Sequence, residues 1–379
     1  MFGWMAAALL LQVAQPVVDT ADIIVCGQRA DRALANCLQR GCNVPDDVRL
    51  TMALAEAQFG QGQYRGARET LRQGIERTKG QRAAYPRQIS ALYEATATIN
   101  RHIGDMEGYR SAVLAQTSLL REHVDENDLQ RRMLPLTLGD SWMDRGKWRQ
   151  ALAVYTDAQR QYVEVGDTRL ASLAGLRRVS VMLARDDVAG ARRALSEISD
   201  ASVSQDSIVA PIRAILAARI AKASGHDGEV DRVVAALQTD GAQPPIVAQE
   251  APLEDIDRNV PDETQRMADQ PVIRSGAGGG EPIQWVDVSY MVRPDGRVTD
   301  VEILRGKGDR KWAAPYVAQI ASRRYLPIAL TDGRPGLYRL ERLTRRARLI
   351  VPTGSFIRQA MGQVSVERQD LTRYDVASK

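Results

Sequence analysis

The chain has 379 residues, more than one hydrophobic core usually serves, so two or three domains are expected. A composition of 44% hydrophobic and 26% charged residues is typical of a globular protein and excludes a disordered or collagen-like chain. The net charge of +4 is too small to indicate nucleic-acid binding. Three Cys and three His are spaced too widely for a zinc site, so no metal or other cofactor is expected.

The first residues resemble an export signal. Residues 1–18 are apolar and uncharged, and no apolar run is long enough to predict a transmembrane helix. We expect residues 1–22 to be a signal-peptide-like segment and the protein to be periplasmic; the alternative is a buried N-terminal segment. Residues 23–46 are predicted to form a helical cap that contains Cys26, Cys37 and Cys42. In an oxidising compartment Cys37 and Cys42 could form a disulfide across Gly41, or the thiols could stay free.

A repeat recurs between residues 47 and 239. Gly62-Gln-Tyr64-Arg-Gly-Ala67 returns as Gly146-Lys-Trp148-Arg-Gln-Ala151, and weaker copies give turn positions at 62, 104, 146, 186 and 225. After the third turn, apolar residues fall at i, i+3, i+4 and i+7, which is one face of a helix. The unit is therefore predicted to be a helix–turn–helix, and stacked units would bury a continuous core.

These copies resemble the tetratricopeptide repeat family. The third copy matches the pattern of that family best, at Leu138, Gly139, Trp142, Gly146, Trp148, Ala151, Tyr155 and Ala158. The resemblance implies an α-helical solenoid that binds an extended or helical peptide in a groove along its first helices. The groove positions carried over from the family are Glu94, Thr98, Arg101, Asp140, Met143 and Asp144. Each of these residues could instead be ordinary solvated helix surface.

Residues 240–282 are predicted to be a flexible linker. The segment contains six prolines and a glycine cluster, and its acidic residues outnumber its basic ones by nine to three. The glycine cluster does not predict a phosphate loop, because no strand precedes it and no Lys-Ser or Lys-Thr follows it.

Residues 283–352 are predicted to form a β-β-α-β module. Residues 284–292 alternate apolar and polar, Arg293-Pro-Asp-Gly296 favours a tight turn, and residues 297–304 form the second strand of a hairpin. A helix is expected over residues 312–324 and a last strand over residues 337–351. A polar tail, 353–379, follows, in which Val364 and Val366 could add one short strand.

This module resembles the C-terminal domain of the energy-transducer TonB family. The resemblance is carried by Val286-Asp-Val288-Ser-Tyr290-Met-Val292, Pro294-Asp-Gly296 and Arg324-Tyr-Leu-Pro327. It implies an open sheet edge that takes up the N-terminal segment of an outer-membrane receptor as an added strand. The opening Tyr-Pro segment and the membrane anchor of that family are missing, so an accessory role in TonB-dependent transport is expected.

The last strand is predicted to be a basic edge, with Arg339, Arg342 and Arg345 as its candidate binding residues. Such an edge would bind an acidic peptide or make a peripheral contact with anionic envelope lipid. The alternatives are a solvated edge and an edge covered by the acidic linker of the chain itself.

The fold class is therefore predicted to be α+β and multidomain, a tetratricopeptide-like solenoid followed by a small TonB-like module. No enzyme is expected, because the three His lie on different repeats without a nucleophile at motif spacing. The predicted function is a periplasmic protein–protein interaction adaptor accessory to TonB-dependent transport; the alternative is a scaffold of an envelope assembly unrelated to energy transduction. A third hypothesis is an enzyme whose site lies between the domains, with Asp140 or Asp144 as a perturbed acid beside Trp142.

Overall fold

The computed structural model describes residues 20–198, 206–226, 228–237, 239–240, 244–251, 283–330, 333–350 and 359–372. The predicted signal segment up to residue 19, linker residues 252–282 and the Cys26 side chain lie outside the described part of the chain.

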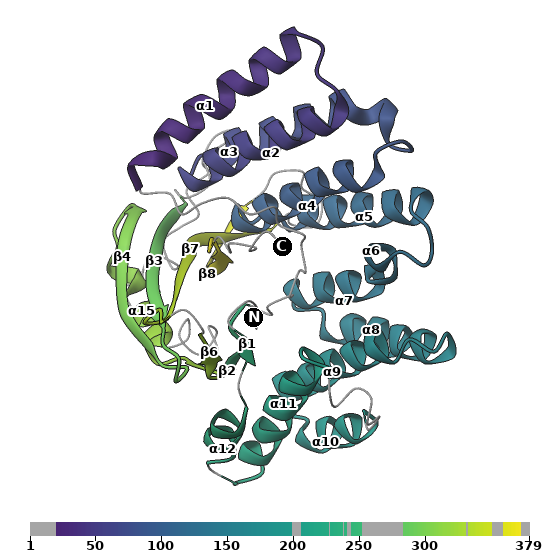
Figure 1. Ribbon diagram of the computed structural model, residues 1–379, viewed down its shortest axis with the longest axis vertical. Coiled ribbons are helices and arrows are strands. Elements are labelled where there is room, and N and C mark those ends of the chain that lie inside the picture. Colours follow the sequence, from purple (N-terminus) through teal and green to yellow (C-terminus); the bar gives the residue numbers. More distant parts are fainter. Residues whose placement is uncertain are drawn as a thin grey trace.

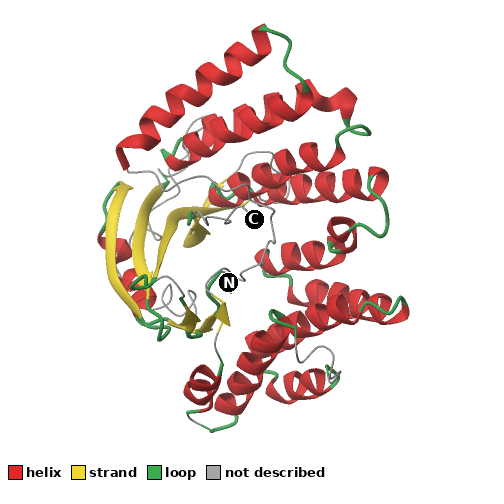
Figure 2. Cartoon of the chain, in the orientation of Figure 1, coloured by secondary structure: helices red, strands yellow, loops and turns green. Residues whose placement is uncertain are grey.

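Within the described residues, five antiparallel helix pairs follow one another. The first helices of the pairs are α2 (Val44–Gly60), α4 (Pro86–His102), α7 (Leu134–Asp144), α9 (Thr168–Ala184) and α11 (Val209–Ala223). The second helices are α3 (Tyr64–Thr78), α5 (Met106–His123), α8 (Trp148–Glu164), α10 (Val188–Ser196) and α12 (Glu229–Ala236). Helix α1 (Thr20–Gln39) precedes the pairs, and the short α6 (Leu129–Arg132) lies before α7. The pairs confirm the predicted helical repeat and curve into the arc seen in Figures 1 and 2.

All five predicted turn positions have the left-handed backbone that ends one helix and starts the next. Their φ angles are 73° at Gly62, 78° at Gly104, 67° at Gly146, 60° at Asp186 and 87° at Gly225. Only glycine adopts this conformation without a steric cost, and Asp and Asn tolerate it better than other residues. The repeat spacing in the sequence therefore marks a real structural period, including the copy in which Asp replaces Gly.

The apolar face of each helix packs between neighbouring pairs. In the third pair Ala151, Tyr155 and Ala158 of α8 are at most 1% exposed and pack with Leu136 of α7. A fully buried side chain of Leu size contributes roughly 1.5–3 kcal/mol. Stacking of pairs, rather than any single helix, therefore supplies the core of the array.

A four-stranded antiparallel sheet forms the second unit, with strand order β4-β3-β7-β8. Its strands are β3 (Gln284–Val292), β4 (Val298–Lys307), β7 (Leu337–Ile350) and β8 (Gln359–Asp370). Helix α15 (Ala314–Ala321) lies between β4 and β7 in the chain, so the predicted hairpin, helix and strand are all present. The predicted turn closes with a hydrogen bond of 2.8 Å from the Gly296 N–H to the Arg293 carbonyl.

Two predicted boundaries of this unit are wrong. The segment placed in the polar tail supplies β8, which pairs with β7 along most of its length. Two short strands, β1 (Thr239–Asp240) and β2 (Val247–Gln249), come from the region around the start of the predicted linker. They pair with β6 (Ile328–Ala329) and β5 (Arg324–Tyr325), respectively, so the chain joins the sheet unit before residue 252.

Strand β3 is buried on both faces, whereas the alternation in the sequence predicted one buried face. Val286, Val288, Tyr290 and Val292 lie on the predicted face and pack with α15. The opposite face of β3 is buried as well, because Trp285 packs with residues of α2, α3 and α4. The second buried face of the sheet is thus a contact with the helical array.

Candidate partner-binding surfaces

The sheet contacts the first two helix pairs through a set of residues that we call the N-terminal contact. It consists of Phe59, Gly60, Gly62, Tyr64 and His102 on the helices, and Trp285, Asp287, Arg342 and Thr344 on the sheet. The Trp285 indole lies over Gly62, where a Cβ atom would come within 2.2 Å of the indole nitrogen. The turn glycine of the first repeat therefore also makes room for the sheet.

Arg342 is the central side chain of the N-terminal contact. Its guanidinium donates to the Gly60 carbonyl at 2.7 Å and to the Phe59 carbonyl, both at the C-terminal end of α2. The same group pairs with Asp287 at 2.6 Å and stacks on the Trp285 ring at 3.9 Å from its centroid. A helix C-terminus has unpaired carbonyls and a partial negative charge, so it is a favourable site for a cation.

Thr344 joins two helices to the sheet through its hydroxyl. The hydroxyl lies 3.1 Å from the Tyr64 hydroxyl on α3 and 2.9 Å from Nδ1 of His102 on α4. All three side chains are buried, and burial raises the pKa of Tyr64, which therefore stays a neutral hydroxyl. Because these buried polar groups are partners of one another, the contact is specific rather than merely apolar.

A second contact, which we call the C-terminal contact, joins the sheet unit to the last helix pair. Ala248 of β2 and Leu326 pack among Ile215 and Ala218 of α11 and the valines of α12. Arg219 of α11 donates to the Ala248 carbonyl at 3.0 Å. In Figure 1 the sheet unit spans from α2–α4 at one end of the helical array to α11–α12 at the other. The helices and the sheet therefore form a ring, which we call the closed array.

The predicted groove residues on α4 and α7 lie close together, but most are already engaged within the chain. Arg101 pairs with Asp144 at 3.0 Å and with Glu367 of β8 at 3.0 Å, and the Tyr109 hydroxyl donates to Asp144 at 2.7 Å. In the same way Asp140 pairs with Arg177 of α9 at 2.8 Å. These ion pairs connect consecutive repeats and link α4 to the sheet.

The other three groove positions differ from one another. Met143 is buried, with only 4% of its surface exposed, so it belongs to the core. Glu94 and Thr98 are half-buried, and burial raises the pKa of Glu94, which accepts a hydrogen bond from Gln116. The predicted groove is therefore a half-buried polar surface and not an open channel of free charges.

The predicted basic edge is wrong. Strand β7 lies between β3 and β8, and the side chains of Arg339 and Arg342 are fully buried. Arg339 pairs with Asp370 at 2.8 Å, and Arg345 donates to Gln284 at 3.0 Å. The prediction failed because at most one short strand was expected in the tail, whereas β8 runs over Gln359–Asp370 and pairs with β7, which therefore has no open edge there.

A buried ion network inside the sheet unit was not predicted from any pattern in the sequence. Arg323, only 1% exposed, pairs with Glu341 at 2.8 Å and with Glu250 at 3.2 Å, and Arg368 pairs with Glu250 at 2.7 Å. Burial would raise the pKa of Glu341, but Arg323 and Arg368 outweigh it and lower that pKa to about 2. One of the acids of the predicted linker, Glu250, thus binds arginines of the sheet unit.

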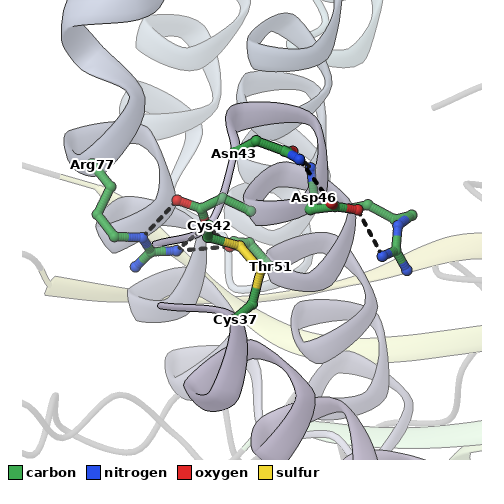
Figure 3. The surroundings of a disulfide bond; sticks show 8 residues. Cys37, Cys42, Asn43, Asp46, Thr51 and Arg77 are labelled. Carbon is green, nitrogen blue, oxygen red and sulfur yellow. Dashed lines mark hydrogen bonds and ion pairs between the residues drawn. A yellow bond between two sulfur atoms is a disulfide. The ribbon is translucent and has the colours of Figure 1, made fainter. Parts of the chain in front are cut away.

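A disulfide joins Cys37 at the end of α1 to Cys42 just before α2 (Figure 3). The two Cα atoms are 4.9 Å apart, and Gly41 has a φ of 85° in the turn between them. Asn43 caps α2 by accepting a hydrogen bond from the Asp46 N–H at 2.9 Å. A shallow hollow beside the disulfide is lined by residues of this turn, including Asn36, Arg40 and Asn43.

The described residues contain neither a candidate metal site nor a candidate membrane-spanning helix. No cluster of three or more His, Cys, Asp or Glu side chains there could hold a metal ion. Within the same residues, no helix combines the length and apolar character that crossing a membrane requires.

Comparison with known proteins gives distant structural similarities only. No family model matches the sequence, and no curated protein matches it. The chain is similar to BtubC (BKLC) from P. vanneervenii, with 17% identity, a TM-score of 0.44, and coverage of 57% of this chain and 90% of that one. It is also similar to a putative kinesin light chain with nearly identical TPR-like repeats from Podosopora anserina, and to a variant of that protein. Both are 13% identical over 47% of this chain, match over 86% and 85% of their own chains, respectively, and have a TM-score of 0.40. At TM-scores below 0.5 these similarities carry no argument about function.

Proposed function

We propose that the protein is a non-catalytic protein–protein interaction scaffold whose partner binds the middle of the helical array. The observation that carries this proposal is the row of ion pairs between consecutive first helices, Arg101 with Asp144 and Asp140 with Arg177. These pairs hold α4, α7 and α9 in a fixed relation and so preorganise a surface for a partner, which lowers the entropic cost of binding. The polar contacts to the sheet described above come from α2, α3, α4 and α11, so α7 and α9 are the helices we assign to the partner.

The state of Asp140 and Asp144 supports a non-catalytic role. Each carboxylate is held by an arginine and also accepts a hydrogen bond from a tyrosine, Tyr155 for Asp140 and Tyr109 for Asp144. Both carboxylates therefore serve contacts between the helices of the array. Because each carboxylate is already engaged by an arginine and a tyrosine, we favour a scaffold over an enzyme built on either residue.

We further propose that the protein works in the periplasm. The Cys37–Cys42 disulfide supports this location, because such bonds persist in oxidising compartments and are rare in the cytosol. The apolar residues 1–18 provide a second, independent argument from the sequence.

Photo-crosslinking in the native cells tests the scaffold proposal. Probes at Thr137 of α7 and Ser180 of α9 should capture one and the same protein, because the two positions lie on adjacent first helices. A probe at Arg160 of α8, whose side chain is 66% exposed, is the control and should not capture that protein. Capture by the control alone, or of different proteins by the two probes, would contradict a shared partner surface.

A role in TonB-dependent uptake is the second candidate, and it rests on the resemblance of residues 286–327. The observation that favours it is the position of β4, which has β3 as its strand neighbour on one side and ends the described sheet on the other. A receptor segment would therefore add next to β4 rather than next to β7. Probes at Glu302 and Lys307 of β4 should then crosslink the N-terminal segment of an outer-membrane receptor, and failure to do so would leave only the scaffold role.

A further inference from the structure

His102 lies at the centre of the N-terminal contact and is the only histidine among its residues. The side chain is fully buried, with 0% of its surface exposed. Its ring packs edge-on against Phe59, with the centroids 5.0 Å apart, and stacks on Tyr64 at 6.1 Å. Its Nδ1 atom lies 2.9 Å from the Thr344 hydroxyl of β7, so the ring touches both the helices and the sheet.

The surroundings of this ring are strongly cationic. Three arginines act on the ring, Arg101 on α4 and Arg342 and Arg346 on β7. Tyr64 on α3 stacks on it, and the carboxylates paired with these arginines include Asp287 on β3 and Glu367 on β8. Asp287 is occupied by Arg342 and Arg305, and Glu367 is occupied by Arg101. Neither carboxylate is therefore available to neutralise a proton on the ring.

Burial and three arginines all favour the neutral ring. Burial lowers the pKa of His102 well below its ordinary value, and Arg101, Arg342 and Arg346 lower it further, while Gln369 has a weaker opposite effect. Protonation in place would add a fourth positive charge to a buried site, which is strongly unfavourable.

We propose that the N-terminal contact is an acid-sensitive latch, which holds the sheet on α2–α4 while His102 is neutral and releases it when His102 takes up a proton. The C-terminal contact keeps the sheet attached to α11 and α12 after release, so the closed array opens on one side. Opening exposes α2 and α4 next to the helices assigned to the partner. The latch depends on the contact alone and not on the identity or existence of that partner.

The direction and size of the effect follow from proton linkage. In the released state the ring is solvated and regains a pKa near 6.5, so below that pH the released state binds more protons than the closed one. The closed state is therefore fully favoured above about pH 6.5 and loses stability as the pH falls. Between pH 7 and pH 5 the ratio of released to closed protein should rise roughly 25-fold.

Fluorine NMR of the full chain labelled with 5-fluorotryptophan tests the latch. The Trp285 resonance, assigned by its loss in Trp285→Phe, should report closed and released populations because the indole lies in the contact. We expect the rise of about 25-fold in wild type and in His226→Asn, whose exposed side chain lies at a repeat turn, and no comparable rise in His102→Asn. An equal pH dependence in wild type and His102→Asn would overturn the proposal.

A direct titration keeps the proposal testable if His102→Asn fails to fold. The imidazole resonances of wild-type protein can be followed with pH, and His102 is identified by elimination with His123→Asn and His226→Asn. We expect the His102 ring to stay neutral in the closed protein and to titrate only together with the Trp285 change. Titration of His102 near pH 6.5 in the closed protein would overturn the latch. Loss of partner capture in the crosslinking experiment would leave both of these results unchanged, so the two proposals fail separately.

Discussion

At the scale of single residues, two glycines of the repeat turns share a backbone conformation but differ in what surrounds them. Gly62 has a φ of 73° and Gly146 a φ of 67°. A Cβ atom at residue 62 would meet the Trp285 indole at 2.2 Å, whereas at residue 146 it would meet nothing within 4 Å. Comparing substitutions at these two glycines therefore separates the loss of stability caused by the left-handed turn from the loss caused by displacing the sheet.

Substitution of the two glycines should show this difference. Gly146→Ala is expected to cost about 1–2 kcal/mol, because only the backbone is strained. Gly62→Ala should cost a further ~1–3 kcal/mol for overpacking against Trp285 and should shift the Trp285 fluorine resonance at pH 7. Urea unfolding of both variants measures the costs, and equal costs with an unshifted resonance would show that Trp285 does not lie over Gly62.

Glu341 is the second residue whose role can be measured. Its carboxylate is 2% exposed between Arg323 and Arg368, and its pKa of about 2 lies below the ordinary value for Glu. A lowered pKa means that the stabilising contribution is present above pH 4.5 and is lost as the pH falls towards 2. Glu341→Gln should therefore cost about 3–5 kcal/mol at pH 7, because it leaves Arg323 without its main partner.

The decisive measurement is how the stability lost in Glu341→Gln depends on pH. The stability difference between wild type and Glu341→Gln should shrink when urea unfolding is repeated near pH 2.5, where wild-type Glu341 begins to protonate. Glu302→Gln, at an exposed position of β4, is the matched control and should change stability by less than about 0.5 kcal/mol. A difference that is the same at both pH values would contradict the assigned ion pair.

At the scale of elements, the sequence predicted what local patterns determine. The left-handed turn positions and strand β3 were predicted because each leaves a signature in neighbouring residues: a repeat spacing in one case and strict alternation in the other. Strand β8 was predicted only as a possible short strand at Val364 and Val366, because the rest of residues 359–370 has no alternation and gains its place by pairing with β7. The groove residues were located correctly on their helices, but their ion pairs join residues far apart in sequence, which no local pattern can show.

Helix α1 is held next to α2 by the Cys37–Cys42 disulfide. The structure describes the α1 side chains of residues 29–39, and Leu34 is the only one of these that is buried. Packing therefore contributes little to the stability of this part of the helix. A disulfide that closes so short a loop contributes about 2 kcal/mol by restricting the unfolded chain. The Cys37→Ser/Cys42→Ser double variant should therefore show faster hydrogen exchange in residues 29–39, while exchange in α4 stays unchanged. Unchanged exchange in α1 would mean that packing alone holds it.

At the scale of the whole molecule, the sheet is held at both ends of the helical array. The N-terminal contact relies on buried polar groups around Arg342, and the C-terminal contact relies on apolar packing around Ala248 and Leu326. When one contact breaks, the other keeps the sheet at a high effective concentration near its site. Closure should therefore be cooperative: each contact makes the other easier to form.

Small-angle scattering of variants at the two contacts tests this cooperativity. Gly62→Ala weakens the N-terminal contact, and Arg219→Ala removes the hydrogen bonds to the Ala248 carbonyl at the C-terminal contact. Each single variant should keep a maximum dimension close to that of wild type at pH 7, because the remaining contact still holds the sheet. The double variant should expand by clearly more than the sum of the two single changes, because both contacts are then weakened at once and neither holds the sheet firmly while the other reforms. Full expansion in either single variant would show instead that one contact alone closes the array.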